Sequence, residues 1–204
     1  YGPVEMVQWG TPSHSVDYFD VKGDVEELLA PMGCEFRPGD HPSMHPGRCA
    51  SVWREGACIG HVGELHPKWR QRYELPQPPV LFELSLEAVS AGQVPVFSPV
   101  SRFQPVERDL AIVVNETITH AAVMAAVKGV GDVLLRDAVL FDVYRPKKGA
   151  EPSGAGALAT DEKSLAVRLF FSRDDANLTD AEVDAVVQRV LGELERRVSA
   201  RLRA

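Results

Sequence analysis

Six side chains that could bind a metal ion occur close together in the first half of the 204-residue chain. They are His41, His45, Cys49, Cys58, His61 and His66. A structural zinc site takes closely spaced pairs, such as C-x2-C or H-x3-H, on firmly held elements. Only the two histidines of HPSMHPGR have such a spacing, and proline and glycine interrupt that segment. We therefore interpret these histidines as loop and turn residues and predict no metal site.

A second group with catalytic side chains is formed by Ser13, His14 and Asp17. A hydrolytic triad is defined by how its members meet in space, and the G-x-S-x-G turn that presents a serine nucleophile is absent from the sequence. We therefore predict no catalytic residue in this chain.

Composition limits the class of protein. A hydrophobic share of 45% and a charged share of 25% are ordinary for a globular protein of one or two domains. No apolar run approaches the roughly 20 residues that span a bilayer. Three cysteines in unrelated contexts favour a reducing compartment such as the cytoplasm. Because the chain begins at Tyr1 without Met or a leader pattern, we expect a piece of a longer chain.

Charge is distributed unevenly along the chain. Residues 1–97 hold 7 Lys and Arg against 13 Asp and Glu, whereas residues 98–204 hold 15 against 16. The first half is therefore not expected to bind nucleic acid on its own. In the second half, any contact with nucleic acid must come from a local basic patch.

The first half is predicted to form strands and helices. Alternation or β-rich composition predicts strands at 4–9, 34–37, 49–53, 57–62 and 79–86, and apolar spacing predicts helices at 17–30 and 67–74. Gly23 lies inside the first helix, where glycine costs about 1 kcal/mol relative to alanine. We therefore expect another backbone to pack closely against it.

The second half is organised around residues 101–114, SRFQPVERDLAIVV, whose apolar positions alternate as in a strand. After it the sequence predicts a helix capped by Thr119, strands at 133–145 and 164–172, a helix opened by the capping box at 179–182, and an edge strand at 200–204. Residues 146–162 are turn-rich and are expected to form a mobile loop. The order β-α-β-β-α-β is the split βαβ, ferredoxin-like arrangement, so the fold class is α+β.

Helices on one face of such a sheet leave the other face open. If the helices cover Leu110, Ile112, Val139, Phe141, Val167 and Leu169, the open face carries Ala111, Ala138, Tyr144, Ala166, Arg168 and Phe170. Aromatic and arginine side chains on an open sheet suit single-stranded RNA, whose bases stack on flat groups. We predict base contacts by Tyr144, Arg168 and Phe170, and phosphate contacts by Arg102, Arg145, Lys147, Lys148 and Lys163. The pattern is equally compatible with a face that packs against a protein partner.

Arg108 and Asp109 stand at the entry of the first strand of this half. We assign them mainly to structure, as a charged pair that fixes the strand's entry.

Seven stretches, taken in order, resemble the C-terminal region of bacterial phenylalanine–tRNA ligase (phenylalanyl-tRNA synthetase) beta subunits. They are VDYFDVKGDVEELL (16–29), HPGR (45–48), IGHVGELHP (59–67), LFELSLEAV (81–89), SRFQPVERDLAIVV (101–114), LFDVYR (140–145) and LTDAEVDAVV (178–187). Each stretch is weak alone, but the ordered set covers nearly the whole chain.

The resemblance implies an incomplete, inactive class II synthetase-like module built on an antiparallel sheet at 1–91, a linker at 92–100 and a ferredoxin-fold anticodon-binding domain at 101–204. It further implies a cytoplasmic enzyme that uses ATP and magnesium, with the alpha subunit and phenylalanine tRNA as partners and with neither a membrane nor DNA. In that family amino-acid activation occurs on the alpha subunit. The chain is therefore expected to contribute subunit assembly and anticodon-region binding, without cofactors of its own. A purely structural module that docks a partner subunit is the alternative.

Overall fold

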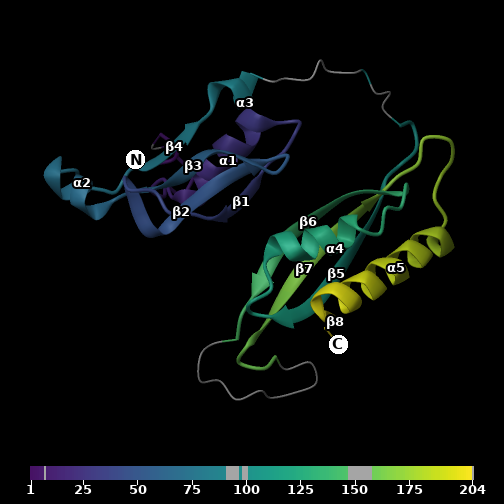
Figure 1. The fold of residues 1–204 in the computed structure, drawn as a ribbon. Helices are drawn as coiled ribbons and strands as arrows, with labels where there is room; N and C mark the ends of the chain where they lie inside the picture. Colours follow the sequence, from purple (N-terminus) through teal and green to yellow (C-terminus); the bar gives the residue numbers. More distant parts are fainter. Residues whose placement is uncertain (7, 91–96, 98–100, 147–157, 204) are drawn as a thin grey trace. The chain divides into compact units, whose positions relative to one another are not determined.

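The computed structural model describes the whole chain except residues 7, 91–96, 98–100, 147–157 and 204 (Figure 1). The chain divides into two compact units, Tyr1–Val96 and Phe97–Ala204, called unit 1 and unit 2 below. The predicted linker at 92–100 falls almost entirely outside the described residues, as does most of the predicted loop at 146–162.

Unit 1 contains a four-stranded antiparallel sheet in the order β1-β2-β3-β4. Its strands are β1 (Glu35–Pro38), β2 (Met44–Arg54), β3 (Ala57–Leu65) and β4 (Val80–Leu84). Its helices are α1 (Tyr18–Leu29), α2 (Pro67–Arg72) and α3 (Leu86–Ser90). This is the antiparallel sheet that the resemblance to class II synthetase-like modules implies.

Helix α1 forms the core of unit 1 together with the sheet. Its first turn is closed by a capping box, because the Asp17 carboxylate accepts from backbone N–H groups while the Asp20 carboxylate accepts from the Asp17 N–H. Apolar residues four apart on α1 share one face of the helix and are buried against the sheet. The core residues are Val21, Val25, Leu29, Ala50, Val52 and Val62.

The turn between β2 and β3 explains their pairing. Glu55 and Gly56 have positive φ values of 50° and 81°, as both central residues of a two-residue type I′ hairpin turn require. Such a turn matches the twist of the two strands that it joins. The predicted hairpin is confirmed.

Two expectations for unit 1 are wrong. The described residues of 4–9 form no strand, and the N-terminal segment has only a single bridge between Pro3 and Ser15. A Cβ placed on Gly23 would meet no atom within 4 Å, because this glycine lies on the solvent side of α1. Close packing therefore does not explain the glycine.

Unit 2 has the predicted β-α-β-β-α-β order. Its elements are β5 (Val106–Asn115), α4 (His120–Lys128), β6 (Leu135–Tyr144), β7 (Glu162–Phe171), α5 (Asp180–Val198) and β8 (Arg201–Leu202). The strand order is β6-β7-β5-β8, with neighbours antiparallel. Since β7 separates β5 from β6, the βαβ unit is split, which defines the ferredoxin-like topology. Figure 1 shows α4 and α5 on the same face of this sheet.

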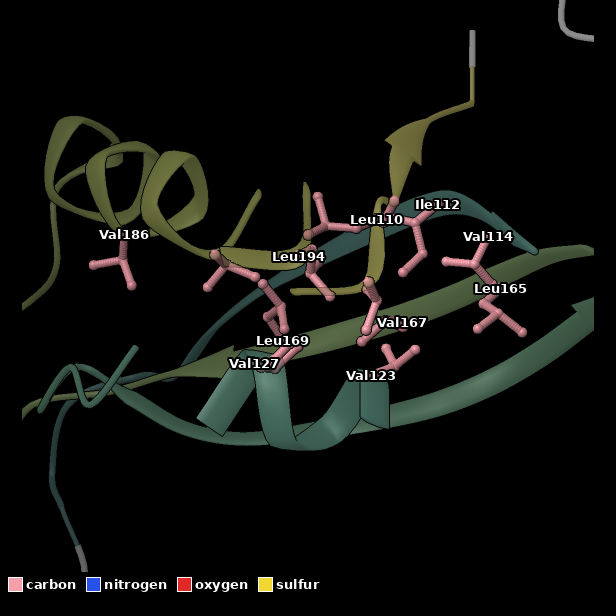
Figure 2. Packing of buried hydrophobic residues seen from close by; sticks show 14 of the residues in the cluster. Leu110, Ile112, Val114, Val123, Val127, Leu165, Val167, Leu169, Val186 and Leu194 are labelled. Carbon is pink, nitrogen blue, oxygen red and sulfur yellow. The ribbon is translucent and has the colours of Figure 1, made fainter. Parts of the chain in front are cut away.

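The core of unit 2 lies between these helices and the sheet (Figure 2). The buried side chains labelled there are Leu110, Ile112, Val114, Val123, Val127, Leu165, Val167, Leu169, Val186 and Leu194. Helix α5 presents its apolar residues at three- and four-residue spacing and begins at a second capping box, formed by Thr179 and Glu182. The predicted burial of alternate residues on β5 and β7 is confirmed.

Strand β6 departs from the predicted alternation. Leu140 is opposite Val167 and Asp142 is opposite Ala166, so Phe141 is an extra residue in a β-bulge. As a result Val139 and Phe141 are 44% and 53% exposed, while Leu140 packs against the core.

A second irregularity lies between Leu135 and Asp137. The predicted burial of Val139 and Phe141, and the predicted exposure of Ala138 on the open face, are therefore wrong. The two irregularities break the simple two-residue alternation on which those predictions relied.

Candidate RNA-binding face

The face of the unit 2 sheet opposite α4 and α5 is here called the open face. Residues directly opposite in neighbouring antiparallel strands have side chains on the same side. Pairing therefore assigns to this face Glu107, Asp109, Ala111, Val113, Asp137, Val139, Asp142, Tyr144, Ser164, Ala166, Arg168, Phe170 and Arg201, with the bulged Phe141 among them. Arg203 continues this face beyond β8, since its N–H donates to the Ala111 carbonyl at 2.9 Å.

Arg168 occupies the centre of the open face and is held by the carboxylates of Asp109 and Glu107. Its Nε and Nη2 donate to the two carboxylate oxygens of Asp109 at 2.7 and 2.8 Å, and Nη1 lies 3.3 Å from Glu107. Hydrogen bonding to the Arg168 guanidinium lowers the pKa of Asp109 and raises the pKa of Arg168 itself. The guanidinium also lies 5.2 Å from the ring centre of Phe141. The Arg168 guanidinium therefore contacts the Phe141 ring, and its positive charge is already balanced by Asp109 and Glu107.

Tyr144 lies on the edge strand β6, at the end of the open face where β8 pairs with β5, in a row that crosses all four strands. Tyr144 is opposite Ser164, Ser164 is opposite Val113, and Val113 is opposite Arg201. The guanidinium of Arg203 lies 5.0 Å from the Tyr144 ring centre. Because β7 and β5 separate these two residues, their side chains must reach over those strands. That contact accounts for the burial of Val113 and Ser164, which are 1% and 4% exposed although they lie on the open face.

The predicted phosphate-binding residues are placed differently from one another. Arg102 is exposed and has no partner among the described residues, whereas Arg145 donates from Nε to Glu116 at 2.9 Å. Lys163 is only 8% exposed, and its ammonium donates to the Glu116 carbonyl at 2.8 Å. Since Lys163 is buried and bonded, it is unsuited to a phosphate contact. Lys147 and Lys148 lie outside the described residues.

Arg108 and Asp109 do not form a pair with each other. As neighbours on a strand their side chains point to opposite faces. The Arg108 guanidinium donates to Asp180 at 2.6 Å, which ties β5 to the first turn of α5, while Asp109 binds Arg168 on the open face. The predicted charged pair is therefore wrong, and two separate ion pairs replace it.

Several residues of the open face were missed by the sequence reasoning. Phe141 was missed because a bulge leaves no reliable signal in a single sequence. The sequence does place Glu107 and Asp109 on the open face, since they lie four and two residues before Ala111, a predicted open-face position. Arg203 lies within the predicted edge strand at 200–204. Glu107 and Asp137, both opposite Phe170, and Asp109, opposite Arg168, make the Phe170 end of the face acidic, whereas Asp142 is opposite Ala166. The positive charge lies near Tyr144.

The histidine and cysteine residues of unit 1 do not come together as a metal site. His45 lies in β2, so its loop interpretation is wrong, whereas His61 lies in β3, as the predicted strand at 57–62 implies. His41 and His61 have ring centres 5.1 Å apart. Within the described part of the chain, no group of three or more His, Cys, Asp or Glu side chains could hold a metal ion. The described residues thus provide no fit for a catalytic magnesium ion, and we derive no step through one.

Unit 2 is a ferredoxin-like α+β domain, and its residues 101–203 match the family model described as "Ferredoxin-fold anticodon binding domain". Residues 1–86 match the model "Phenylalanyl tRNA synthetase beta chain CLM domain". The chain is 43% identical over 196 residues to the phenylalanine–tRNA ligase beta subunit of Dechloromonas aromatica, with 96% of this chain and 24% of that protein covered. It is 42% identical over 210 residues to that of Burkholderia pseudomallei, with 100% and 25% covered.

The chain belongs to the family of phenylalanine–tRNA ligase beta subunits. It spans about a quarter of the length of the curated relatives that it matches. The predicted resemblance and the predicted α+β class are confirmed. Among the helices of the described residues, none combines the length and the apolar character needed to cross a bilayer.

Proposed function

We propose that this chain serves as the C-terminal part of a phenylalanine–tRNA ligase beta subunit and that unit 2 binds the anticodon region of phenylalanine tRNA. In the intact enzyme, ATP and magnesium would act at a site on the alpha subunit, in the cytoplasm, and this chain would supply no catalytic residue. We take residues 1–91 as the catalytic-like module and 101–204 as the RNA-binding module.

One observation carries this proposal: Phe141, Tyr144 and Arg203 lie on the same open sheet face, where the Arg203 guanidinium contacts the Tyr144 ring. Phe141 and Tyr144 are 53% and 48% exposed, and Arg203 has no carboxylate partner among the described residues. Exposed rings offer stacking surfaces for unpaired bases, and an uncompensated guanidinium offers a phosphate contact. The site we propose is therefore centred on Tyr144 and Arg203, at a distance from the acidic Phe170 side.

Unit 1 has features of a surface that contacts another protein. Phe19 and Leu28 on α1 are 74% and 48% exposed, and Phe82 and Leu86 are 44% and 78% exposed. Large apolar side chains left exposed on a small unit are typical of interaction surfaces. This supports a role of unit 1 in assembly with the alpha subunit.

A rival function is that the open face docks a protein partner. The exposed side chains of Val139 and Phe141, beside several carboxylates, favour this alternative. The two functions differ in salt dependence, because phosphate contacts release counterions whereas an apolar contact does not.

The test is a titration of the phenylalanine tRNA anticodon stem-loop into the full chain at two salt concentrations, with a scrambled-loop hairpin as the control. We expect salt-sensitive binding that prefers the native loop and that weakens in Tyr144→Ala and Arg203→Gln. Lys128→Gln removes an exposed cation at the end of α4, on the helix side, and should bind as the unaltered chain does. Absence of binding at low salt by a folded sample would refute the anticodon-binding role.

A further inference from the structure

Helix α2 of unit 1 carries an exposed cluster of aromatic and basic side chains. Trp69 and Tyr73 have ring centres 6.2 Å apart and are inclined by 22°, as stacked rings are. Lys68 and Arg72 flank the tryptophan, at 5.3 and 5.7 Å from its ring. Tyr73 is 63% exposed, and Lys68 and Arg72 are exposed as well. We call these four residues the α2 cluster.

The charge of the α2 cluster is uncompensated in an otherwise acidic unit. Three of the seven Lys and Arg residues of unit 1 lie within 68–72, against 13 Asp and Glu in the unit. Neither Lys68 nor Arg72 has a carboxylate partner among the described residues. The acidic residue that precedes α2, Glu64, is already bound by Arg48, whose Nη1 lies 2.8 and 2.9 Å from its two oxygens.

The other cations of unit 1 behave differently. Lys22 is paired with Glu26, and Arg37 with Glu35. The third cation of α2, Arg70, donates to the carbonyls of Leu75 and Pro76 and so fixes the segment that leads to β4. Unlike these three cations, Lys68 and Arg72 have neither a carboxylate nor a carbonyl partner among the described residues.

Packing of unit 1 does not account for the cluster. Helix α2 has no buried residue, and Figure 1 shows it projecting from the end of the sheet on the excursion between β3 and β4. The cation–π contacts themselves contribute only about 0.5–1 kcal/mol each at exposed sites. The exposed Tyr73 ring, stacked on the half-buried Trp69 beside Lys68 and Arg72, is therefore available to a ligand that is both flat and anionic.

We propose that the α2 cluster is a second RNA contact, in which Lys68 and Arg72 meet phosphates of phenylalanine tRNA outside the anticodon stem-loop and Tyr73 stacks on an exposed base or ribose. RNA is the ligand class that combines anionic groups with flat rings. The inference goes beyond the proposed function, which assigns RNA binding to unit 2 alone. It differs from the expectation from net charge, which was that the first half does not bind nucleic acid on its own.

The experiment uses the full chain and two probes, a transcript of whole phenylalanine tRNA and its isolated anticodon stem-loop. The test variant is Lys68→Gln/Arg72→Gln, and the matched control Lys22→Gln/Arg37→Gln removes two cations from the same unit. At about 0.7 per phosphate in the slope of log affinity against log salt, loss of one or two contacts weakens binding about 5- to 25-fold near 0.1 M salt. We expect that loss for whole tRNA and no change for the stem-loop.

Tyr73→Ala separates stacking from charge. We expect weaker binding of whole tRNA with an unchanged salt slope, because no cation is removed. Unchanged affinity of both α2 variants for whole tRNA, or a loss matched by the control, would overturn the inference and leave an acidic protein segment as the candidate occupant. If the stem-loop fails to bind while whole tRNA still depends on the α2 cluster, the anticodon proposal fails and this inference stands.

Discussion

The ion pair between Arg168 and Asp109 leads to an expectation of stronger, not weaker, RNA binding on mutation. Asp109→Asn removes a carboxylate that holds Arg168 through two hydrogen bonds of 2.7 and 2.8 Å. Arg168 then keeps only the 3.3 Å contact with Glu107, and the open face loses one negative charge. The released guanidinium is free to turn toward a phosphate.

The expected size of this gain follows from counterion release. One additional phosphate contact with single-stranded RNA adds about 0.7 to the slope of log affinity against log salt, which amounts to about fivefold at 0.1 M salt. Asp109→Asn should therefore bind the anticodon stem-loop about fivefold more tightly at that salt, with a steeper salt dependence.

The assay is a fluorescence-anisotropy titration of labelled stem-loop over a series of salt concentrations. Asp180→Asn is the matched control, because it removes a carboxylate paired with an arginine of β5 on the other side of the sheet. The control should leave the affinity nearly unchanged. Weaker binding by Asp109→Asn, in a sample that melts normally, would refute the view that Arg168 is held back by its carboxylates.

The remaining predictions concern stability, measured by chemical denaturation. Leu169→Ala should lower the free energy of unfolding by about 2–5 kcal/mol, because Leu169 is fully buried. Val139→Ala should lower it far less, because Val139 is 44% exposed. Equal losses would contradict the bulged register of β6. Gly23→Ala and Gly192→Ala, in helix interiors where a Cβ meets no atom within 4 Å, should each stabilise by about 0.5–1 kcal/mol, and destabilisation would mean hidden crowding. Hydrogen bonds from Thr179 lower the pKa of Glu182 below its ordinary 4.5. The contribution of Glu182 to the free energy of unfolding is therefore present above about pH 4.5 and is lost as the pH falls through the lowered pKa. Glu182→Gln should weaken the acid dependence of stability, and an unchanged pH profile would contradict the capping role.

The sequence was sufficient for those parts of the fold that depend on local pattern. The apolar alternation of β5 and β7, the stripe of α5 and its capping box at Thr179 all follow from spacing, and the structure contains them. The element order then leaves the ferredoxin-like topology as the natural arrangement. These signals are reliable because each depends on a repeated choice of residue type.

The register of the strands and the ion-pair partners of the charged side chains were harder to predict from the sequence. A bulge inserts one residue into a strand and leaves no mark in its composition. The sequence therefore assigned Ala138, Val139 and Phe141 of β6 to the wrong faces of the sheet. The partners of Arg108 and Asp109 depend on the face of the sheet from which each side chain projects. They also depend on how the turn before α5 places Asp180 next to β5. A single sequence does not contain that distance information. The charge of the open face was misjudged for the same reason, since its carboxylates were not counted with its arginine.

The most direct test of the central claim is amide chemical-shift mapping of the full chain with the phenylalanine tRNA anticodon stem-loop. The account predicts shifts centred on Phe141, Tyr144, the facing part of β7 and Arg203, with α4 and α5 little affected. Shifts concentrated on the helices, or no shifts in unit 2 under conditions where the RNA is bound, would contradict the claim that the open face binds RNA.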